Sequence, residues 1–334
     1  MRVLVATDAW RPQVNGVVRS LENLATEAPS FDAHVSFLTP KDFRTVPLPG
    51  YSEIRLALAP PGAVKRAIAL ARPDFVHIAT EGPIGWIARH VCQKEGYPFT
   101  TSYHTRFPEY LAARLPVPLA WSYSALRRFH NSGAGIMVGS PTLREELAAR
   151  GFSNLMLWSR GVDAQVFRPR IERPLAFPTP VFLFVGRLSI EKNITAFLTL
   201  DLPGSKVVVG DGPLRPRLET EFPDAHFLGT RTGEALAEVY ASADVFIFPS
   251  LTDTFGIVLL EALACGLPVA AFPVMGPLDV IGQSECGRLD TNLQRAALGA
   301  LDISRERCRA YASKFTWRES ARQFIENIKR AHDV

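Results

Sequence analysis

Short apolar runs alternate with amphipathic segments along the whole chain, and this alternation restricts the fold more than any other feature. In the first half, β-branched or apolar runs at residues 3–7, 75–79 and 99–103 are separated by segments of helical periodicity, and the second half repeats the pattern. Strands that alternate with helices build parallel sheets joined by right-handed crossovers. Because 334 residues exceed one ordinary core, we predict an α/β protein with two doubly wound parallel-sheet domains.

A proline-rich segment marks the domain boundary that the sequence predicts. Residues 167–180 contain four prolines and three arginines with few apolar residues, which is typical of a linker. We therefore expect an N-terminal domain over residues 1–166 and a C-terminal domain over residues 181–314. The last residues, 315–334, predict an amphipathic helix that either closes the second domain or packs back against the first.

The composition is that of a globular protein from a reducing compartment. Hydrophobic residues make up 47% of the chain and charged residues 21%. The four cysteines are scattered, with no C-x-x-C pair and no histidine at ligand spacing, so neither a disulfide framework nor a zinc site is expected. Residues 1–8 predict a first strand rather than a signal peptide, and no run of 18 apolar residues occurs. We therefore expect a cytoplasmic protein.

The positive charge is concentrated in the N-terminal half. Residues 1–165 contain 18 Lys and Arg against 13 Asp and Glu, whereas the remainder contains 19 against 20. This imbalance predicts an acidic surface or partner for the first half; the alternative is a set of ordinary arginine-rich helix faces exposed to water.

Residues 250–266 place two acidic residues on either side of an expected helix start. Asp253 follows an apolar strand, Glu261 lies eight positions later on the next helix, and Phe255-Gly256 turns the chain between them. The first N–H groups of that helix would face an anion, with one carboxylate on each side to accept hydrogen bonds from hydroxyls. This arrangement suits a sugar nucleotide, whose diphosphate lies between a sugar and a ribose. The alternative is a buried α/β unit with a capping Asp and one satisfied Glu.

Four other strand ends carry residues suited to anion or sugar chemistry. Gly16 lacks a Cβ, so its backbone can approach a phosphate at a helix start. Arg187 and Lys192 lie where two cations can clamp a diphosphate, although a surface pair with the neighbouring glutamate is the alternative. Asp211 lies in a glycine-flanked turn that would shape a cleft wall. His104 follows a strand, where it either hydrogen-bonds a sugar hydroxyl or carbonyl or is an ordinary buried histidine.

Three motifs together resemble those of retaining glycosyltransferases of family 4, which have the two-Rossmann GT-B fold: V-G-R-L-S-I-E-K-N, V-V-V-G-D-G-P and D-T-F-G-I-V-L-L-E-A-L-A-C-G-L-P-V. The resemblance covers nearly the whole chain. It implies that Arg187 and Lys192 bind the donor diphosphate and that Gly16 approaches it from the other domain. It further implies that Glu261 holds the ribose hydroxyls and that His104 contacts the donor sugar.

The resemblance thereby names a set of site residues. The expected catalytic residues are His104, Arg187, Lys192 and Asp253. The expected donor-binding residues are Gly16, Arg187, Lys192, Asp211, Asp253, Thr254, Phe255, Gly256, Ile257 and Glu261. The family pattern has two glutamates spaced E-x₇-E, and Asp253 replaces the first one here. The shorter acid keeps the carboxylate for the chemistry but leaves the identity of the transferred sugar open.

The chain has no D-x-D motif, so no metal ion bridging the diphosphate and no cofactor are expected. Arg187, Lys192 and helix N-termini would instead offset the charge of the leaving group. The resemblance implies transfer on the same face of the sugar, with the departing phosphate oxygen accepting the proton of the acceptor. No protein nucleophile is evident.

Residues 107–132 combine aromatic and arginine side chains, which is the composition of an element at a membrane interface. An anionic membrane surface, on the inner face of the cytoplasmic membrane, is therefore one expected partner. The alternative is an amphipathic helix packed on its own sheet with its arginines outward. Relatives that the chain resembles glycosylate lipids such as diacylglycerol or phosphatidylinositol mannosides.

We therefore expect transfer of a hexose from a UDP- or GDP-linked sugar to a hydroxyl of a lipid acceptor. The alternatives are a soluble or polysaccharide acceptor, and a nucleotide-sugar-binding protein without turnover. A sugar-nucleotide epimerase of the same fold also remains open, whereas a phosphorylase would need a pyridoxal-phosphate lysine for which no site is evident. No nucleic-acid partner is predicted.

Overall fold

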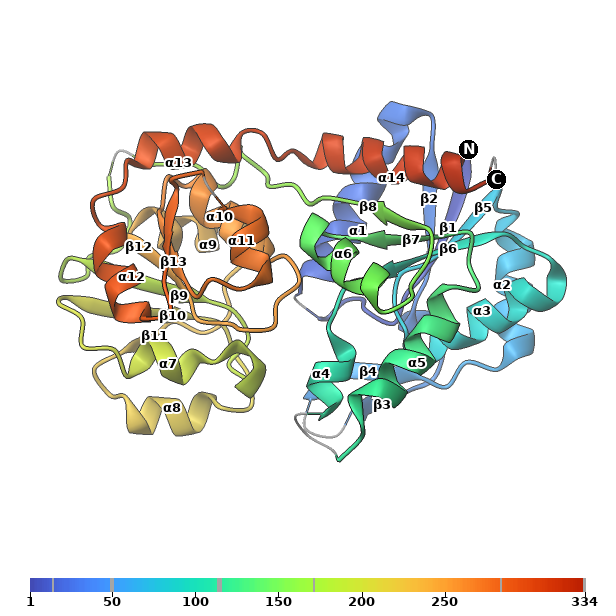
Figure 1. The fold of residues 1–334 in the computed structure, drawn as a ribbon, viewed down its shortest axis with the longest axis horizontal. Helices are drawn as coiled ribbons and strands as arrows, with labels where there is room; N and C mark the ends of the chain where they lie inside the picture. The colour runs from blue at the N-terminus through green and yellow to red at the C-terminus, as the bar shows by residue number, and fades with distance from the viewer. Residues whose placement is uncertain (14, 49–50, 113–115, 171, 283, 333–334) are drawn as a thin grey trace. The chain divides into compact units, whose positions relative to one another are not determined.

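The chain divides into two compact units in a computed structural model, which describes all residues except 14, 49–50, 113–115, 171, 283 and 333–334 (Figure 1). Unit 1 comprises Met1–Arg160 and Trp317–Val334, and unit 2 comprises Gly161–Thr316. Each unit contains a six-stranded sheet whose recorded strand pairs are all parallel. The predicted fold class, two doubly wound parallel α/β sheets, is confirmed.

The division between the units falls at different positions from those that the sequence predicted. Residues 167–180, predicted to be a linker, lie within unit 2. Phe167 is buried in its core, Arg173 forms a salt bridge with Asp244, and the backbone N–H of Leu175 donates to Ser242 Oγ at 3.0 Å. The prolines therefore shape a segment that is anchored by its neighbours. The chain passes between the units twice, after residue 160 and after residue 316.

Unit 1 has the strand order β2-β1-β5-β6-β7-β8 and a separate antiparallel pair, β3-β4. Its strands are β1 (Arg2–Ala6), β2 (His34–Leu38), β3 (Thr45–Leu48), β4 (Tyr51–Ala57), β5 (Phe75–Ile78), β6 (Phe99–Tyr103), β7 (Gly135–Val138) and β8 (Leu155–Leu157). Its helices are α1 (Gly16–Glu27), α2 (Pro61–Ala71), α3 (Pro83–Glu95), α4 (Phe107–Ala112), α5 (Leu119–His130), α6 (Pro141–Ala149) and α14 (Trp317–His332), with 3₁₀ turns at η1 (Ala28–Phe31) and η2 (Pro40–Asp42).

Adjacent residues of each strand point to opposite faces of the sheet, which gives unit 1 two cores. Leu4 and Ala6 of β1 pack with residues of α2, α3 and α5, whereas Val3 and Val5 pack with residues of α1 and α14. The last helix, α14, is tied to the end of β8: Asn327 Nδ2 donates to the Leu157 carbonyl at 2.7 Å. Helix α14 therefore supplies part of the second core of unit 1 (Figure 1).

Unit 2 has the strand order β11-β10-β9-β12-β13-β14. Its strands are β9 (Val181–Val185), β10 (Ser205–Val209), β11 (His226–Phe227), β12 (Val245–Phe248), β13 (Val269–Ala271) and β14 (Gly287–Leu289). Its helices are α7 (Ile194–Leu198), α8 (Arg215–Glu221), α9 (Gly233–Ala241), α10 (Ile257–Ala264), α11 (Met275–Val280), α12 (Leu293–Ala300) and α13 (Arg305–Ala312), with a 3₁₀ turn at η3 (Ile190–Lys192). Residues of α9, α10 and α13 cover one face, and residues of α7, α8 and α12 cover the other.

A buried histidine connects the strands of unit 1 beneath α14. His77 of β5 shares its two ring nitrogens with Thr100 Oγ1 at 2.8 Å and Ser102 Oγ at 2.9 Å, both on β6. Its ring meets the edge of Phe324 at 4.9 Å between centroids. Burial, assisted by the positive charge of Arg160, lowers the pKa of His77 to about 3.

This lowered pKa predicts a loss of stability in acid. The unfolded chain takes up a proton at the ordinary histidine pKa of about 6.5, whereas folded His77 stays neutral until about pH 3. The free energy of unfolding should therefore fall as the pH drops through this window, by up to about 1.4 kcal/mol per pH unit from this group. Replacing His77→Gln should flatten that dependence in urea titrations. The control His90→Gln, at an exposed position of α3, should keep the wild-type slope. Equal slopes for all three proteins would contradict the prediction.

Candidate functional site

The predicted donor residues of unit 2 follow three neighbouring strands. β10, β9 and β12 are adjacent and parallel, so their carboxyl ends meet at one edge of the sheet. Asp211 follows β10, Arg187 and Lys192 follow β9, and residues 253–257 follow β12. Ligands of open α/β sheets bind outside this edge. The sheet order thus gathers residues that are far apart in the chain.

An ion pair joins two of the predicted catalytic residues. Lys192 Nζ lies 2.6 Å from Asp253 Oδ1, and the two side chains are 26% and 15% exposed. The other carboxylate oxygen, Asp253 Oδ2, is buried without a hydrogen-bond partner among the described residues. The sequence predicted a cation for the diphosphate and a carboxylate for sugar hydroxyls. The structure places these two groups in direct contact.

Two hydrogen bonds fix the loops that carry this pair. Asn193 Nδ2 donates to the Pro249 carbonyl at 3.0 Å, and Ser250 Oγ donates to the Glu191 carbonyl at 3.3 Å. Both bonds connect the segment after β9 with the segment after β12. They hold the backbone on each side of the ion pair, so the pair is positioned by the loops and not only by its own charges.

Helix α10 begins next to this pair without a side-chain cap. Gly256, at its N-cap position, has φ +84°, a conformation that L side chains rarely adopt, and no side chain in the described part of the chain caps the helix. Phe255 is buried in the core of unit 2 and anchors the turn. Thr254 and Ile257 flank it. An uncapped helix start can present N–H groups and a positive dipole end to an anion, and the predicted anion contact stays a prediction.

Glu261 lies one turn further along α10 and is only 2% exposed. Its Oε2 accepts a hydrogen bond from the Tyr240 hydroxyl of α9 at 3.1 Å. The two acids of the motif therefore stand in different surroundings: Asp253 faces a lysine and Glu261 faces a phenol. The predicted contact of Glu261 with ribose stays a prediction.

The glycine-flanked turn after β10 lies against the turn after β9. A Cβ on Gly210 would lie 1.9 Å from the Gly186 carbonyl oxygen, and one on Gly212 would lie 2.5 Å from the Leu188 carbonyl oxygen. The Asp211 carboxylate accepts from the Gly212 N–H at 2.7 Å and forms a salt bridge with Arg215 at 2.9 Å. These contacts shape the strand edge through the backbone.

The start of α1 in unit 1 is capped by the residue before Gly16, and the predicted approach of Gly16 to the diphosphate stays a prediction. Gly16 is exposed, but Asn15 Oδ1 accepts the N–H groups of both Val17 and Val18 at 3.0 Å. The first donors of this helix are therefore already occupied by the N-cap side chain. The sequence N-G shows the reason, because asparagine is a preferred N-cap residue.

His104 follows β6 as predicted, and its partner is a residue that sequence reasoning missed. His104 Nδ1 and Arg160 Nη2 are 2.9 Å apart, and the His104 ring lies 5.6 Å from the Trp158 ring. Burial, followed by the positive charge of Arg160, lowers the pKa of His104 well below its ordinary value. The sequence feature that could have indicated Arg160 is the serine–arginine pair of W-S-R-G, shortly after the short strand β8.

Asp8 is a second feature of unit 1 that the sequence did not mark as a site. Its carboxylate accepts from the N–H groups of Ile84 at 2.8 Å and Gly85 at 3.2 Å, and from the Thr80 hydroxyl at 2.9 Å. Burial raises the pKa of Asp8, and these hydrogen bonds oppose the rise. The start of α3 is thus occupied by an internal carboxylate.

The described part of residues 107–132 has features of a helix packed on its own sheet and features of an element at a membrane interface. Tyr123, Leu126 and Phe129 of α5 are buried, as expected for a helix packed on its own unit. In contrast, Trp121 is 73% exposed, and Phe107 and Leu119 are also exposed. Arg127 and Arg128 lie on the exposed surface, whereas Arg114 lies outside the described residues.

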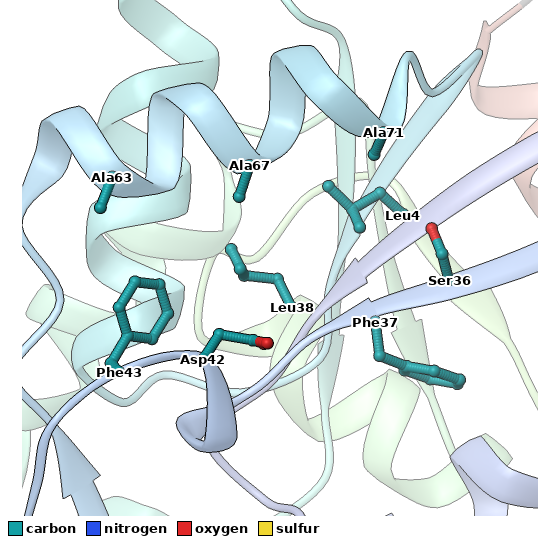
Figure 2. A pocket seen from close by; sticks show the side chains of 9 residues that line it. All are labelled: Leu4, Ser36, Phe37, Leu38, Asp42, Phe43, Ala63, Ala67 and Ala71. Atoms are coloured by element: carbon teal, nitrogen blue, oxygen red, sulfur yellow. The ribbon is translucent and has the colours of Figure 1, made fainter.

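A hollow of about 270 Å³ in unit 1 lies between α2 and strands β1 and β2 (Figure 2). Three alanines of α2 point into it from above, and Leu4, Leu38 and Phe43 line the opposite side. Its one ionisable lining group, Asp42, accepts hydrogen bonds from the backbone N–H and hydroxyl of Thr39. Both hydrogen bonds end on the same carboxylate oxygen, Oδ2, and most of the other lining side chains are apolar.

The described residues contain neither a candidate metal site nor a candidate membrane span. No group of three or more His, Cys, Asp or Glu side chains is arranged to hold a metal ion. No helix among them is long and apolar enough to cross a membrane. All four cysteines are buried and free.

Comparison with known families covers both halves of the chain. A model described as Glycosyltransferase Family 4 matches residues 14–166, and one described as Glycosyl transferases group 1 matches residues 179–300. A GDP-mannose-dependent alpha-mannosyltransferase of Mycobacterium tuberculosis is 32% identical over 86% of this chain and 83% of that protein. The chain belongs to glycosyltransferase family 4.

Other proteins resemble this chain over much of its length. Sulfoquinovosyl transferase SQD2 of Arabidopsis thaliana is 32% identical over 73% of this chain, and the match spans about half, 51%, of that protein. Alpha-monoglucosyldiacylglycerol synthase of Streptococcus pneumoniae is 25% identical over 81% of this chain and 71% of that protein. The solved structure of Anabaena Alr3699/HepE with UDP and glucose superposes with a TM-score of 0.76 at 17% identity, covering 99% of this chain and 100% of that one. This likeness identifies the GT-B fold.

The close approach of the two glycine turns gives a prediction about stability and nucleotide binding. Gly210→Ala should force the turns after β9 and β10 apart, because the added methyl would collide with the Gly186 carbonyl oxygen. Gly233→Ala is the matched control: Gly233 also has positive φ, but nothing lies within 4 Å of its Cβ position. The control should lose about 1–2 kcal/mol from the left-handed conformation alone. Gly210→Ala should lose more and should also weaken nucleotide binding, as measured by calorimetry. Equal losses in the two variants would contradict this account.

Proposed function

We propose that this glycosyltransferase is a retaining enzyme that moves a hexose from a UDP- or GDP-linked sugar to a hydroxyl of a lipid acceptor without a metal ion. Family membership supports nucleotide-sugar chemistry. The observation that carries the proposal is the Lys192–Asp253 pair beside the uncapped start of α10, at the carboxyl edge of the unit 2 sheet. This arrangement offers a cation, a carboxylate and helix N–H groups within one small region.

Donor binding rearranges this pair in the proposed mechanism. The diphosphate takes the charge of Lys192 together with Arg187, and the α10 start adds its dipole. Asp253 then exchanges its lysine partner for hydroxyls of the transferred sugar. In this proposal Glu261 contacts the ribose and His104 contacts the transferred sugar. The existing ion pair keeps both groups compensated while no donor is bound.

The transfer step breaks the bond between the anomeric carbon and the phosphate oxygen and forms a bond from that carbon to the acceptor oxygen on the same face. The acceptor proton passes to the departing phosphate oxygen. Arg187, Lys192 and the helix start stabilise the charge that develops on the diphosphate, the electrostatic contribution that dominates many enzymes. Metal independence rests on these cations and on the lack of a D-x-D motif in the sequence.

Two observations support a lipid acceptor. Phe107, Leu119 and Trp121 expose apolar side chains near Arg127 and Arg128 in the chain, which suits contact with an anionic lipid surface. The names of two relatives are also consistent, since one is a monoglucosyldiacylglycerol synthase and another a phosphatidylinositol dimannoside mannosyltransferase. A cytoplasmic enzyme attached peripherally to the inner face of the membrane fits this proposal.

The central test is turnover with a panel of UDP-, GDP- and ADP-linked hexoses, supplied with a lipid extract and, in parallel, with soluble oligosaccharides. We expect a labelled glycolipid with the anomeric configuration of the donor, and the same rate in excess EDTA. Loss of turnover in EDTA that Mg²⁺ or Mn²⁺ restores would overturn metal independence. Product formed only on oligosaccharides would replace the lipid acceptor, and binding without turnover would indicate a nucleotide-sugar-binding protein.

Variants at the ion pair test the site itself. Lys192→Ala should weaken binding of the nucleoside diphosphate by about 1.5–3 kcal/mol, roughly ten- to a hundredfold, as expected for a lost charged hydrogen bond. Arg217→Gln, which removes an exposed cation paired with Glu221, is the control and should bind normally. Wild-type affinity in Lys192→Ala would place the donor elsewhere.

Membrane attachment gives a separate prediction. Replacing Arg114, Arg127 and Arg128 by Gln should weaken binding to anionic liposomes, because each arginine near such a surface contributes about 1 kcal/mol. Trp121→Ser should also weaken it by removing an exposed aromatic side chain. A charge-matched control replaces three exposed arginines of other elements by Gln: Arg217, Arg307 and Arg318. The idea fails if wild-type protein ignores anionic liposomes at low salt, or if the control weakens binding as much.

A further inference from the structure

Arg160 of unit 1 is a buried cation whose recorded partners are all neutral. It is 6% exposed, and its Nη1 donates to the carbonyl oxygens of Trp158 at 2.5 Å and Ser159 at 3.1 Å. Its Cζ lies 4.4 Å from the centre of the Trp158 ring. No carboxylate within the described ranges forms a salt bridge with it. Burying a charge without a carboxylate partner costs free energy. The charge of Arg160 therefore acts directly on its neutral neighbours.

The remaining partner is His104. Arg160 Nη2 lies 2.9 Å from His104 Nδ1. A guanidinium can only donate hydrogen bonds, so Nδ1 must accept, and the hydrogen of the neutral imidazole must lie on Nε2. Stacking on Trp158 and two carbonyl acceptors hold the guanidinium in place. The contact therefore determines the tautomer of His104 from heavy-atom geometry alone.

The surroundings of His104 also oppose a second positive charge. The ionisable groups that act on it are Arg160, His77 of β5 and His130 of α5. His130 is itself engaged with Thr101 Oγ1 at 2.8 Å and Glu81 Oε1 at 3.1 Å. Protonating His104 at Nδ1 would turn the hydrogen bond from Arg160 into a clash between two donors. Arg160 thus excludes both the other tautomer and the imidazolium.

We infer that Arg160 locks His104 as a hydrogen-bond donor through Nε2 and prevents it from accepting a proton during glycosyl transfer. This inference rests on the proposed function, in which His104 contacts the donor sugar. A nitrogen that can only donate recognises an oxygen lone pair of the substrate. It cannot serve as a general base, so the acceptor proton must go elsewhere, which agrees with transfer to the departing phosphate oxygen. Arg160 is a positioning residue that acts through His104.

The tautomer and protonation state of His104 are measured directly by ¹⁵N NMR on histidine-labelled protein, with the His104 signals assigned by comparison with His104→Gln. In the wild type, His104 should remain neutral with its hydrogen on Nε2 from about pH 5.5 to 8. In Arg160→Met, it should populate both tautomers and take up a proton closer to the ordinary histidine pKa of about 6.5. A wild-type hydrogen on Nδ1, or an unchanged tautomer in Arg160→Met, overturns the inference. The wild-type spectrum decides the tautomer even if the variant does not fold.

The kinetic consequence is a change in the pH profile. In Arg160→Met, kcat/KM at about pH 6 should fall about fourfold relative to its value at pH 8, because a histidine with a pKa of about 6.5 is only about one quarter neutral at pH 6. The wild type should show no such fall. Arg160→Lys should restore part of the wild-type profile, because lysine retains a charge and a donor.

Arg150→Met is the matched control, since Arg150 also lies over an aromatic ring, 4.1 Å from the centre of Tyr123, but has no histidine partner in the recorded contacts. It should keep the wild-type profile. A profile that is unchanged in Arg160→Met, despite an altered tautomer, overturns the role of the lock in transfer. If no donor supports turnover in the wild type, the proposed function fails, while the NMR experiment still decides whether Arg160 sets the state of His104.

Discussion

Parallel pairing is the constraint on which the rest of this molecule depends. The chain connects one parallel strand to the next through a crossover, so all strands of the sheet run in the same direction. Their carboxyl ends therefore lie at the same edge. In unit 2 this rule brings the turns after β10, β9 and β12 together, and with them Lys192 and Asp253, which are 61 positions apart in sequence. In unit 1 the same rule places His104 after β6 and Arg160 after β8, on either side of the end of β7.

The positive charges of Lys192 in unit 2 and Arg160 in unit 1 are stabilised by different kinds of neighbour. Lys192 in unit 2 is paired with a carboxylate and remains partly exposed, so its charge is available to a ligand that can displace Asp253. Arg160 in unit 1 is buried among carbonyl oxygens, an indole and an imidazole, and burial lowers its pKa to about 9. It still carries its charge near neutral pH. The first arrangement suits binding of an anion, whereas the second suits control of a neighbouring side chain.

The sequence predicted the features that depend on local pattern and missed those that depend on contacts across the fold. Strand–helix alternation indicated the two sheets, and the motif around Gly256 indicated an uncapped helix start. The Lys192–Asp253 contact could not be predicted, because it requires the order of β9 and β12 in the sheet. The prolines of residues 167–180 suggested a linker, but the burial of Phe167 and the salt bridge of Arg173 with Asp244 depend on distant partners. Arg160 was missed because the strand that precedes it, β8, is only three residues long, and an arginine after so short a strand is expected to be exposed.

The discontinuity of unit 1 has a consequence for the order in which the chain folds during synthesis. Multidomain chains generally fold from the N-terminus as they emerge from the ribosome. Here unit 2 is one continuous stretch, whereas the core of unit 1 that contains Val3, Val5 and Trp158 also needs Phe324 and Ile328 of α14. The nascent chain must therefore carry an apolar sheet face that α1 covers only in part through the translation of some 150 residues, the typical size of a whole domain. Unit 2 can complete its core first, and the domain that begins at the N-terminus is the last to close.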